Sequence, residues 1–254
     1  MNNNYLTDTH FHLDLDDDID NILENARKEG VRNFIISGCD LKGIEEGIKI
    51  INKYENIYLT IGIHPDEIND FNDITISYLE KLILENEKII GIGEIGLDYY
   101  HNKENKESQK RIFKLQLDLS QKLDLPVVIH SRDAFLDTYN ILKEYDLKGT
   151  IHCFSGSLEC AKMYIDLGYL LGIGGVSTYK NTNLTSVLKE IDLNHIVFET
   201  DSPYLTPEPI RTEVNEPKNV SIICDNLCQI KNKTREEVIK ITTNNVINNY
   251  NRLK

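Results

Sequence analysis

Two histidines separated by one residue, His10 and His12, suggest chemistry by their type and spacing. In an extended segment, residues i and i+2 point to the same side, so the two imidazoles lie side by side while Phe11 faces the other way. Such a pair supplies two neutral nitrogen ligands to a divalent metal ion. Single histidines are more often ordinary polar residues, so the pair predicts a metal centre only if further ligands follow other strands.

A carboxylate within an apolar run is the second signal. Glu94 lies in residues 89–98, which are almost wholly apolar before Asp98. An ionised and unpaired carboxylate would be strongly disfavoured there, so a cation, a metal ion or a raised pKa must compensate. A buried ion pair with an arginine is the alternative, but no arginine ends a predicted strand before Arg132. The sequence therefore favours a metal ligand at this position.

Three further ligands follow apolar runs later in the chain. His130 and His152 each end such a run, and Asp201 comes directly after another. If these runs are parallel strands of one sheet, all of the side chains emerge at the same end of it. The predicted metal ligands are His10, His12, Glu94, His130, His152 and Asp201. Six such residues at one rim favour a metal centre over unrelated polar strand ends.

The elements that position these residues can be predicted from hydrophobic pattern. Short β-branched runs without a polar side alternate with segments of helical periodicity, which is typical of buried parallel strands joined by helices. The predicted strands are residues 5–9, 33–39, 57–63, 89–95, 126–130, 149–153, 169–174 and 195–200. We therefore expect an α/β fold, a (β/α)8 TIM barrel spanning residues 1–254 as a single domain, with two closing helices near 220–230 and 234–249. An open doubly wound sheet is the alternative, but it would gather the polar residues at one switch point.

Net charge and amino-acid composition limit the kinds of molecule that this protein can bind. The formal net charge of −13 argues against a broad basic face for duplex DNA, so any nucleic-acid contact must be local. No long apolar run predicts a transmembrane segment, and residues 1–5 lack the features of a secretory signal, which makes the cytoplasm the expected location. The five cysteines are odd in number and include no Cys-x-x-Cys pair, so we expect no disulfide framework.

Five motifs in order resemble those of the TatD-type metal-dependent deoxyribonucleases. They are residues 9–14 (THFHLD), 93–100 (GEIGLDYY), 129–134 (IHSRDA), 152–156 (HCFSG) and 199–205 (ETDSPYL). The resemblance runs from Asp8 to about Asn245 and implies a metal-dependent hydrolase barrel with the same six ligands. It also implies cleavage of DNA phosphodiester bonds, often from a 3′ end. Because the net charge of −13 leaves only a local attraction for DNA, we expect single strands or frayed ends to be the preferred substrate. The chain departs from the family pattern at Val214, where relatives usually have a basic residue, so a phosphate contact of that loop is in doubt.

The roles of the site residues follow from this ligand set. Two divalent ions could be held, one by His10, His12 and Asp201 and the other by His130 and His152, with Glu94 between them. Two ions roughly 3.5 to 4 Å apart can bind both the attacking and the leaving oxygen of a displacement at phosphorus. Glu94 and Asp201 are thus the predicted catalytic residues, with Asp201 also able to accept a proton from water. Glu199 is expected to orient a ligand. The ions could be Mg, Zn or Mn.

Four other residues are candidates for contact with substrate phosphates: His64, His101, Lys103 and Arg132. For Arg132 an ion pair with Asp133 or Asp137 is an equal alternative. His195 begins the last predicted strand and is expected at the opposite rim. No membrane and no obligate protein partner are expected.

A second enzyme class remains open, because the same barrel and ligands can activate water against a carbonyl carbon. This is an amidohydrolase that cleaves a C–N or C–O bond in a small molecule. Several such enzymes have a lysine where this chain has Glu94. A non-catalytic binding protein with a vestigial site is the third possibility, which the complete ligand set disfavours.

Overall fold

The computed structural model describes residues 5–72 and 74–253. Its strands are β1 (Leu6–Phe11), β2 (Val31–Gly38), β3 (Ile57–Ile61), β4 (Ile89–Asp98), β5 (Val127–Arg132), β6 (Gly149–Ile151), β7 (Tyr169–Ile173) and β8 (Ile196–Phe198). The helices are α1 (Ile19–Lys28), α2 (Leu41–Lys53), α3 (Thr75–Glu85), α4 (Lys106–Leu123), α5 (Phe135–Leu142), α6 (Leu158–Asp166), α7 (Leu184–Glu190), α8 (Val220–Lys231) and α9 (Arg235–Asn249).

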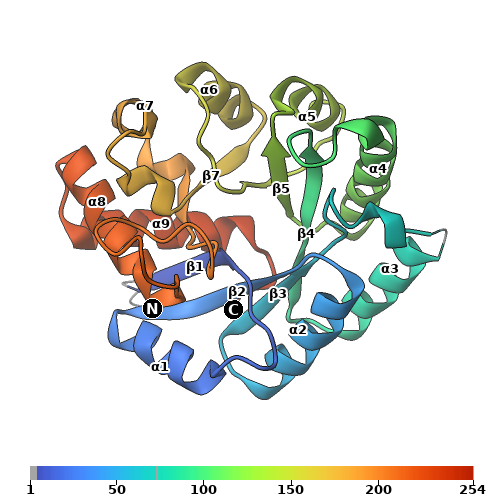
Figure 1. The fold of residues 1–254 in the computed structure, drawn as a ribbon, viewed down its shortest axis with the longest axis horizontal. Helices are drawn as coiled ribbons and strands as arrows, with labels where there is room; N and C mark the ends of the chain where they lie inside the picture. Colours follow the sequence, from blue (N-terminus) through green and yellow to red (C-terminus); the bar gives the residue numbers. More distant parts are fainter. Residues whose placement is uncertain (1–4, 73, 254) are drawn as a thin grey trace.

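The strands form one sheet in the order β1 to β8, and every neighbouring pair is parallel. Helices surround the strands, and the sheet curls until β8 lies beside β1 (Figure 1). The apolar runs are buried along nearly their whole length, as parallel strands covered by helices must be. The predicted TIM barrel is therefore confirmed.

The strand boundaries differ from the prediction where the backbone turns sharply. β6 ends at Ile151 and β8 at Phe198, earlier than expected, and Cys153 and Asp201 beyond them have φ angles of 46° and 55°. These left-handed conformations cannot continue a strand. β4, by contrast, extends to Asp98 because it stays paired with β5 through Asp98 and Arg132. The early strand ends place His152 and Asp201 on turns at the rim.

The seam between the first and last strands is closed by contacts beyond the regular pairing. The amide of Asp201 donates to the carbonyl of His10 at 3.0 Å, and the amide of His12 donates to the carbonyl of Ser202 at 2.8 Å. The buried carboxylate of Asp8 accepts hydrogen bonds from the amide and hydroxyl of Thr200, at 2.9 and 2.5 Å. These bonds hold three predicted metal ligands together at the seam.

The opposite end of the barrel is covered by α9 and the residues after it. Tyr250 and Val246 pack with four side chains from inside the barrel: Ile35, Tyr58, Ile90 and Val197. Tyr250 is fully buried, in agreement with a packing role for this aromatic residue. α9 begins as expected after Thr234, whose hydroxyl and backbone form a capping box with Glu237. The barrel is therefore open to a ligand at the other end, where the strands terminate.

In the described part of the chain, none of the helices combines the length and apolar character needed to cross a bilayer. The cysteines Cys39, Cys153, Cys160, Cys224 and Cys228 are all free. Residues 1–4, on which most of the expectation of a missing secretory signal depends, lie outside the described residues.

Candidate metal centre

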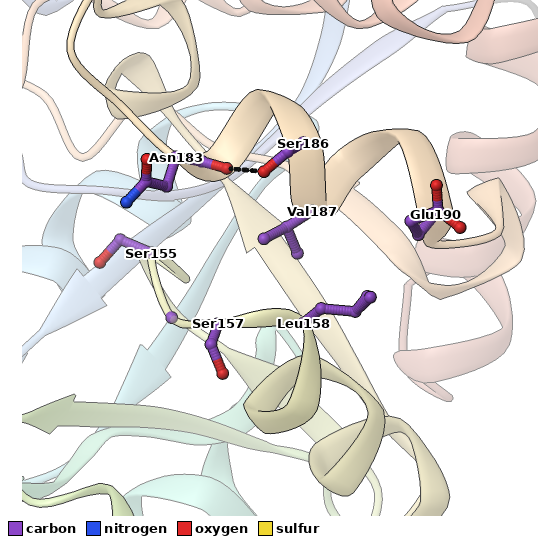
Figure 2. A pocket seen from close by; sticks show the side chains of 8 residues that line it. Ser155, Ser157, Leu158, Asn183, Ser186, Val187 and Glu190 are labelled. Carbon is purple, nitrogen blue, oxygen red and sulfur yellow. Dashed lines mark hydrogen bonds between the residues drawn. The ribbon is translucent and has the colours of Figure 1, made fainter.

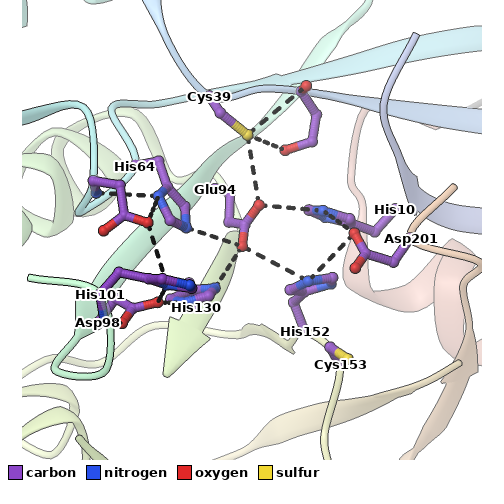
Figure 3. Close-up of polar contacts among 12 residues, drawn as sticks. His10, Cys39, His64, Glu94, Asp98, His101, His130, His152, Cys153 and Asp201 are labelled. Atoms are coloured by element: carbon purple, nitrogen blue, oxygen red, sulfur yellow. Dashed lines mark hydrogen bonds and ion pairs between the residues drawn. The ribbon is translucent and has the colours of Figure 1, made fainter. Parts of the chain in front are cut away.

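All six predicted ligands meet around one buried carboxylate. The oxygens of Glu94 lie 3.3 Å from His10 Nε2, 2.8 Å from His130 Nδ1 and 3.7 Å from His152 Nε2. Asp201 Oδ1 lies 3.3 Å from His12 Nε2 and 3.8 Å from both His10 Nε2 and His152 Nε2. Figure 3 shows Glu94 in the middle, with His10 and Asp201 on one side and His130 on the other.

Glycine permits this close arrangement at one position in particular. Gly96, in the strand of Glu94, has a φ of 150°, and a Cβ there would lie only 2.0 Å from the carbonyl oxygen of His130. A side chain would therefore force β4 away from β5. The absence of one keeps Glu94 within hydrogen-bonding distance of His130.

The donor atoms fit a divalent cation. His10 is 1% exposed, and neither of its ring nitrogens has a hydrogen-bond partner among the described residues, although Nε2 lies near Glu94. A buried imidazole in a protein core normally has a hydrogen-bond partner, and His10 has none within the described chain. A metal cation between His10 and the carboxylates would supply the missing partner. Ligand atoms lie within 4.8 Å of one another in the sets His10–His12–Glu94 and His10–His152–Asp201, and also in His64–Glu94–His130.

Carboxylates outside the ligand set determine which histidine nitrogens face the centre. Asp98 Oδ2 lies 3.0 Å from His130 Nε2, which leaves Nδ1 toward Glu94. Glu199 Oε1 lies 3.1 Å from His152 Nδ1, which leaves Nε2 toward Glu94 and Asp201. The structure therefore places Glu199 in the orienting position expected from the sequence. Such outer carboxylates fix the orientation of ligating imidazoles.

The protonation states of the metal-free centre differ from group to group. Burial alone would raise the pKa of the Glu94 carboxyl, but His152, His10 and His64 outweigh it and hold that pKa well below its usual range. Burial lowers the pKa of His64 to about 4 and that of His10 below its usual value. At neutral pH the centre therefore contains an ionised Glu94 and neutral His10 and His64, which are the forms that bind cations. Burial opposes protonation of His130 and His152, but neighbouring carboxylates outweigh it and raise their pKa to about 9 and about 10, so a metal ion that binds these two imidazoles must displace their protons.

Several residues of the site were not identified from the sequence. Cys39, just after β2, lies 3.5 Å from Glu94 Oε2 and 3.9 Å from His12 Nδ1. Asp98 and Asp66 form a further set with His101, whose Nδ1 is 3.0 Å from Asp98 and 3.6 Å from Asp66. Cys39 and Asp98 stand at strand ends, so the rule that found the histidines could have found them too. His64, expected to contact phosphate, lies 3.6 Å from Glu94 Oε1, within reach of the centre itself.

The two remaining candidates for substrate contact, Arg132 and Lys103, differ in their surroundings. Arg132 has its guanidinium 4.1 Å from the ring centre of Tyr100 and makes no ion pair within residues 5–72 and 74–253. Of its two expected partners, Asp137 is bound by Lys110 and Tyr99 instead. Lys103 is exposed and lies in the short 3-10 helix between β4 and α4. His195 lies before β8, at the end of the barrel opposite the ligands, as expected.

Arg211 is a second cation without a carboxylate partner in the described structure. Arg211 lies on the loop after β8, and its guanidinium is 3.8 Å from the ring centre of Tyr179, which follows β7. The sequence left a phosphate contact of this loop in doubt because of Val214. The structure shows that the loop nevertheless carries a positive charge that no carboxylate neutralises.

One hollow on the surface lies away from the metal ligands. It has a volume of about 520 Å³ and lies between the loop after β6 and α7 (Figure 2). Its lining consists of Ser155, Gly156, Ser157, Leu158, Asn183, Ser186, Val187 and Glu190. This lining has no imidazole and no cation, so the hollow lacks the groups for the chemistry of the centre.

A parallel eight-stranded barrel with histidines and carboxylates gathered at one rim defines a metal-dependent hydrolase. The comparisons with known proteins agree. The family model described as TatD related DNase matches residues 7–251, and the chain belongs to this family.

Relatives support the assignment along the whole chain. The chain is 37% identical to YabD of Bacillus subtilis, an uncharacterised metal-dependent hydrolase, over 94% of this chain and 96% of that protein. It is 33% identical to YcfH of Escherichia coli, described in the same words, over 95% of this chain and 94% of that protein. The crystal structure of the TatD homologue YjjV of Escherichia coli has a TM-score of 0.93 and 27% identity, covering 98% of this chain and 99% of that one.

Proposed function

We propose that this protein is a deoxyribonuclease that hydrolyses phosphodiester bonds with the help of two divalent ions, acting on single strands or frayed ends from the 3′ terminus. The observation that carries the proposal is the position of Glu94, whose oxygens lie within 3.7 Å of a nitrogen of four imidazoles: His10, His64, His130 and His152. A buried carboxylate among four imidazoles has the donor set of a shared metal ligand, whereas a carboxylate of an ordinary buried ion pair faces one cationic partner.

The residues would hold the two ions on either side of Glu94. His10, His12 and Asp201 would bind one, and His130 and His152 the other. The sets of mutually close ligand atoms place His152 nearer to His10 and Asp201, and they place His64 with Glu94 and His130. When bound, divalent ions would polarise the phosphoryl oxygens and make a water molecule more acidic. Mg, Zn and Mn remain the candidates, and the four imidazoles favour Zn or Mn.

The protein's own side chains perform the remaining tasks. Burial opposes ionisation of Asp201, but His152 and His12 outweigh it and lower the pKa of this carboxyl, so it is charged at neutral pH. Its side chain is 14% exposed, which lets it reach a water molecule and accept a proton. Arg132 and Arg211 attract the phosphates, because neither guanidinium is neutralised by a carboxylate of the described chain.

The choice of DNA rests on the family and on these local cations. With a net charge of −13, the surface as a whole repels a polyanion, so attraction must come from the rim. The five free cysteines fit a reducing compartment, which supports a cytoplasmic location.

The test is incubation of the protein, loaded in turn with Mg, Zn and Mn, with end-labelled single-stranded DNA, RNA and a panel of amides and esters. Cleavage of DNA is expected, with loss of activity in Glu94→Gln as the matched control. A circular single strand and a strand blocked at its 3′ end should both resist. Turnover of the amides alone would refute the proposal in favour of an amidohydrolase, and cutting of the circle would refute end-directed action.

A further inference from the structure

Two exposed tyrosines stand at the rim next to the metal centre. The chain has 13 tyrosines and 7 phenylalanines, and in the described part only Tyr100 and Tyr204 are largely exposed, at 54% and 61%. Tyr100 follows β4 and Tyr204 lies in the loop after β8, so both belong to the end of the barrel that carries the ligands. Exposed aromatic rings beside a reaction centre are suited to contact a planar group of a ligand.

The backbone of Tyr204 is firmly held although its ring is exposed. Its amide donates to the carbonyl of Asp201 at 2.8 Å, and its own carbonyl accepts a hydrogen bond from the buried Asn215 at 2.5 Å. The edge of the ring meets His12, with ring centres 5.9 Å apart and planes at 66°. The loop therefore presents a fixed aromatic surface, and little conformational entropy would be lost when a ligand stacks on it.

Tyr100 is fixed in a comparable way and carries a cation. Its amide donates to Asp98 Oδ1 at 2.8 Å, and the guanidinium of Arg132 lies 4.1 Å from its ring centre. A guanidinium is planar and weakly hydrated, so it can stack on an aromatic ring and on a base at the same time. Because Arg132 makes no ion pair in the described chain, its charge is also free to attract a phosphate.

The two aromatic surfaces lie on opposite sides of Glu94. Tyr204 touches His12, whose Nε2 is 3.3 Å from Asp201, on the side of His10. Tyr100 follows Asp98, which is bound to His130 on the other side (Figure 3). A strand whose phosphate lies at Glu94 would therefore have Tyr204 on the side of His12 and Tyr100 on the side of His130.

We propose that Tyr204 and the Tyr100–Arg132 pair are two stacking platforms for the nucleobases on either side of the phosphate to be cleaved. The inference rests on the proposed function and adds the residues that receive the nucleobases of the substrate. In the middle of a duplex the bases are paired and stacked on each other, so they cannot reach these rings, whereas the bases of a single strand can. Every base has a flat face, so the platforms select single strands without selecting a sequence.

The test compares removal of the ring with removal of the base. Tyr204→Leu and Tyr100→Leu keep apolar bulk but remove the ring, and Tyr204→Phe and Tyr100→Phe keep it. The substrates are a short labelled single strand and the same strand with an abasic site next to the cleaved bond. For each leucine variant, KM for the intact strand should rise about fivefold to a hundredfold, corresponding to roughly 1–3 kcal/mol per stacked base. The phenylalanine variants should restore it. On the strand that lacks the corresponding base, the leucine variants should match the wild type.

Leu84→Ala, at an equally exposed apolar residue of α3, serves as the control for surface changes. Circular dichroism and binding of the labelled strand, followed by fluorescence anisotropy, accompany each variant. If the wild type cleaves DNA but the leucine variants lose as much on the abasic strand as on the intact one, the platforms are refuted and the proposed function stands. If the wild type binds the intact strand more tightly than the abasic one through these tyrosines but cleaves neither, the function is refuted and the platforms stand. An unchanged KM in both leucine variants would overturn the inference.

Discussion

Replacing Asn215 by alanine should destabilise the protein strongly, because this one side chain organises the loop after β8. Asn215 is 3% exposed. Its Nδ2 donates to the carbonyls of Thr200 and Tyr204 at 2.8 and 2.5 Å, and its Oδ1 accepts from the amide of Glu216 and from Asn219. Thus a single amide group joins the end of β8 to the start of α8.

The size of the effect can be estimated from these contacts. Alanine would leave the buried carbonyl of Thr200 without its donor and the buried side-chain amide of Asn219 without its acceptor, and each unsatisfied buried group costs about 1.5 kcal/mol. Together the loss is about 3 kcal/mol, which for a chain of this size lowers the melting temperature by roughly 6–12 °C. Asn215→Asp should be at least as harmful, because a carboxylate would face the two carbonyl oxygens in place of the donor.

Urea unfolding of the metal-free protein gives the free energy directly, and Asn140→Ala on the exposed side of α5 is the control, with an expected change below about 0.5 kcal/mol. If Asn215→Ala loses less than about 1 kcal/mol, or if Asn215→Asp is as stable as the wild type, the hydrogen bonds do not hold the loop as described.

The remaining predictions concern the metal centre and its surroundings. Purified protein should bind up to two divalent ions per chain and lose activity on chelation, as measured by elemental analysis and chelator titration; full activity without metal would contradict this. Glu94→Gln should lower metal affinity or turnover at least tenfold, as even changes outside the ligand set can do, and a wild-type metal content and rate would count against its bridging position. We expect about three phosphates to be engaged, by the centre, Arg132 and Arg211. The apparent affinity for a single strand should then fall about 20-fold between roughly 50 and 200 mM salt, and only about sevenfold in Arg132→Gln. A thousandfold loss would instead reveal a wide basic surface in contact with DNA. Burial disfavours the charged form of His130, but its contacts with Asp98 and Glu94 outweigh this and raise the pKa of His130 to about 9. The stability contributed by these two contacts is therefore complete below pH 6.5 and is lost as the pH rises through about 9. Urea unfolding of the metal-free protein should therefore show lower stability at pH 9.5 than at pH 6.5, with a smaller difference in Asp98→Asn, and an equal difference in both proteins would disprove the link.

The barrel and the convergence of the six ligands could be predicted because both follow from local pattern. Buried parallel strands lack a polar face, and the first polar side chain after each strand must emerge at the common rim. That rule accounts for His130, His152 and Asp201, which end or follow apolar runs, and the spacing of two is sufficient for the first histidine pair. Glu94 was predictable for another reason, because a carboxylate inside an apolar run needs a compensating cation. The start of α9 was predictable for the same reason, since a capping box involves residues three apart.

The contacts between different rim loops could not be predicted. Whether Arg132 pairs with a carboxylate or lies on Tyr100 depends on the relative positions of two loops that are distant in sequence, and periodicity contains no information on that. Cys39 was passed over because a single cysteine is usually a packing residue, and only the neighbouring strands reveal its contact with Glu94. The sharp turns at Cys153 and Asp201 likewise depend on backbone conformations that these residue types rarely adopt.

The seam and the covered end of the barrel have a consequence for synthesis on the ribosome. Asp8, near one end of the sequence, has Thr200 as its hydrogen-bond partner, and the cluster that buries the interior side chains Ile35 and Ile90 includes Val246, Tyr250 and Leu253 from the other end. A nascent chain that has not yet released those later segments has an incomplete barrel with exposed apolar surface and an unpaired strand. Such intermediates are the species that aggregate or need chaperones. The fold is therefore completed after translation of nearly all of this sequence, and the binding site for metal ions, which spans the same seam, cannot form before then.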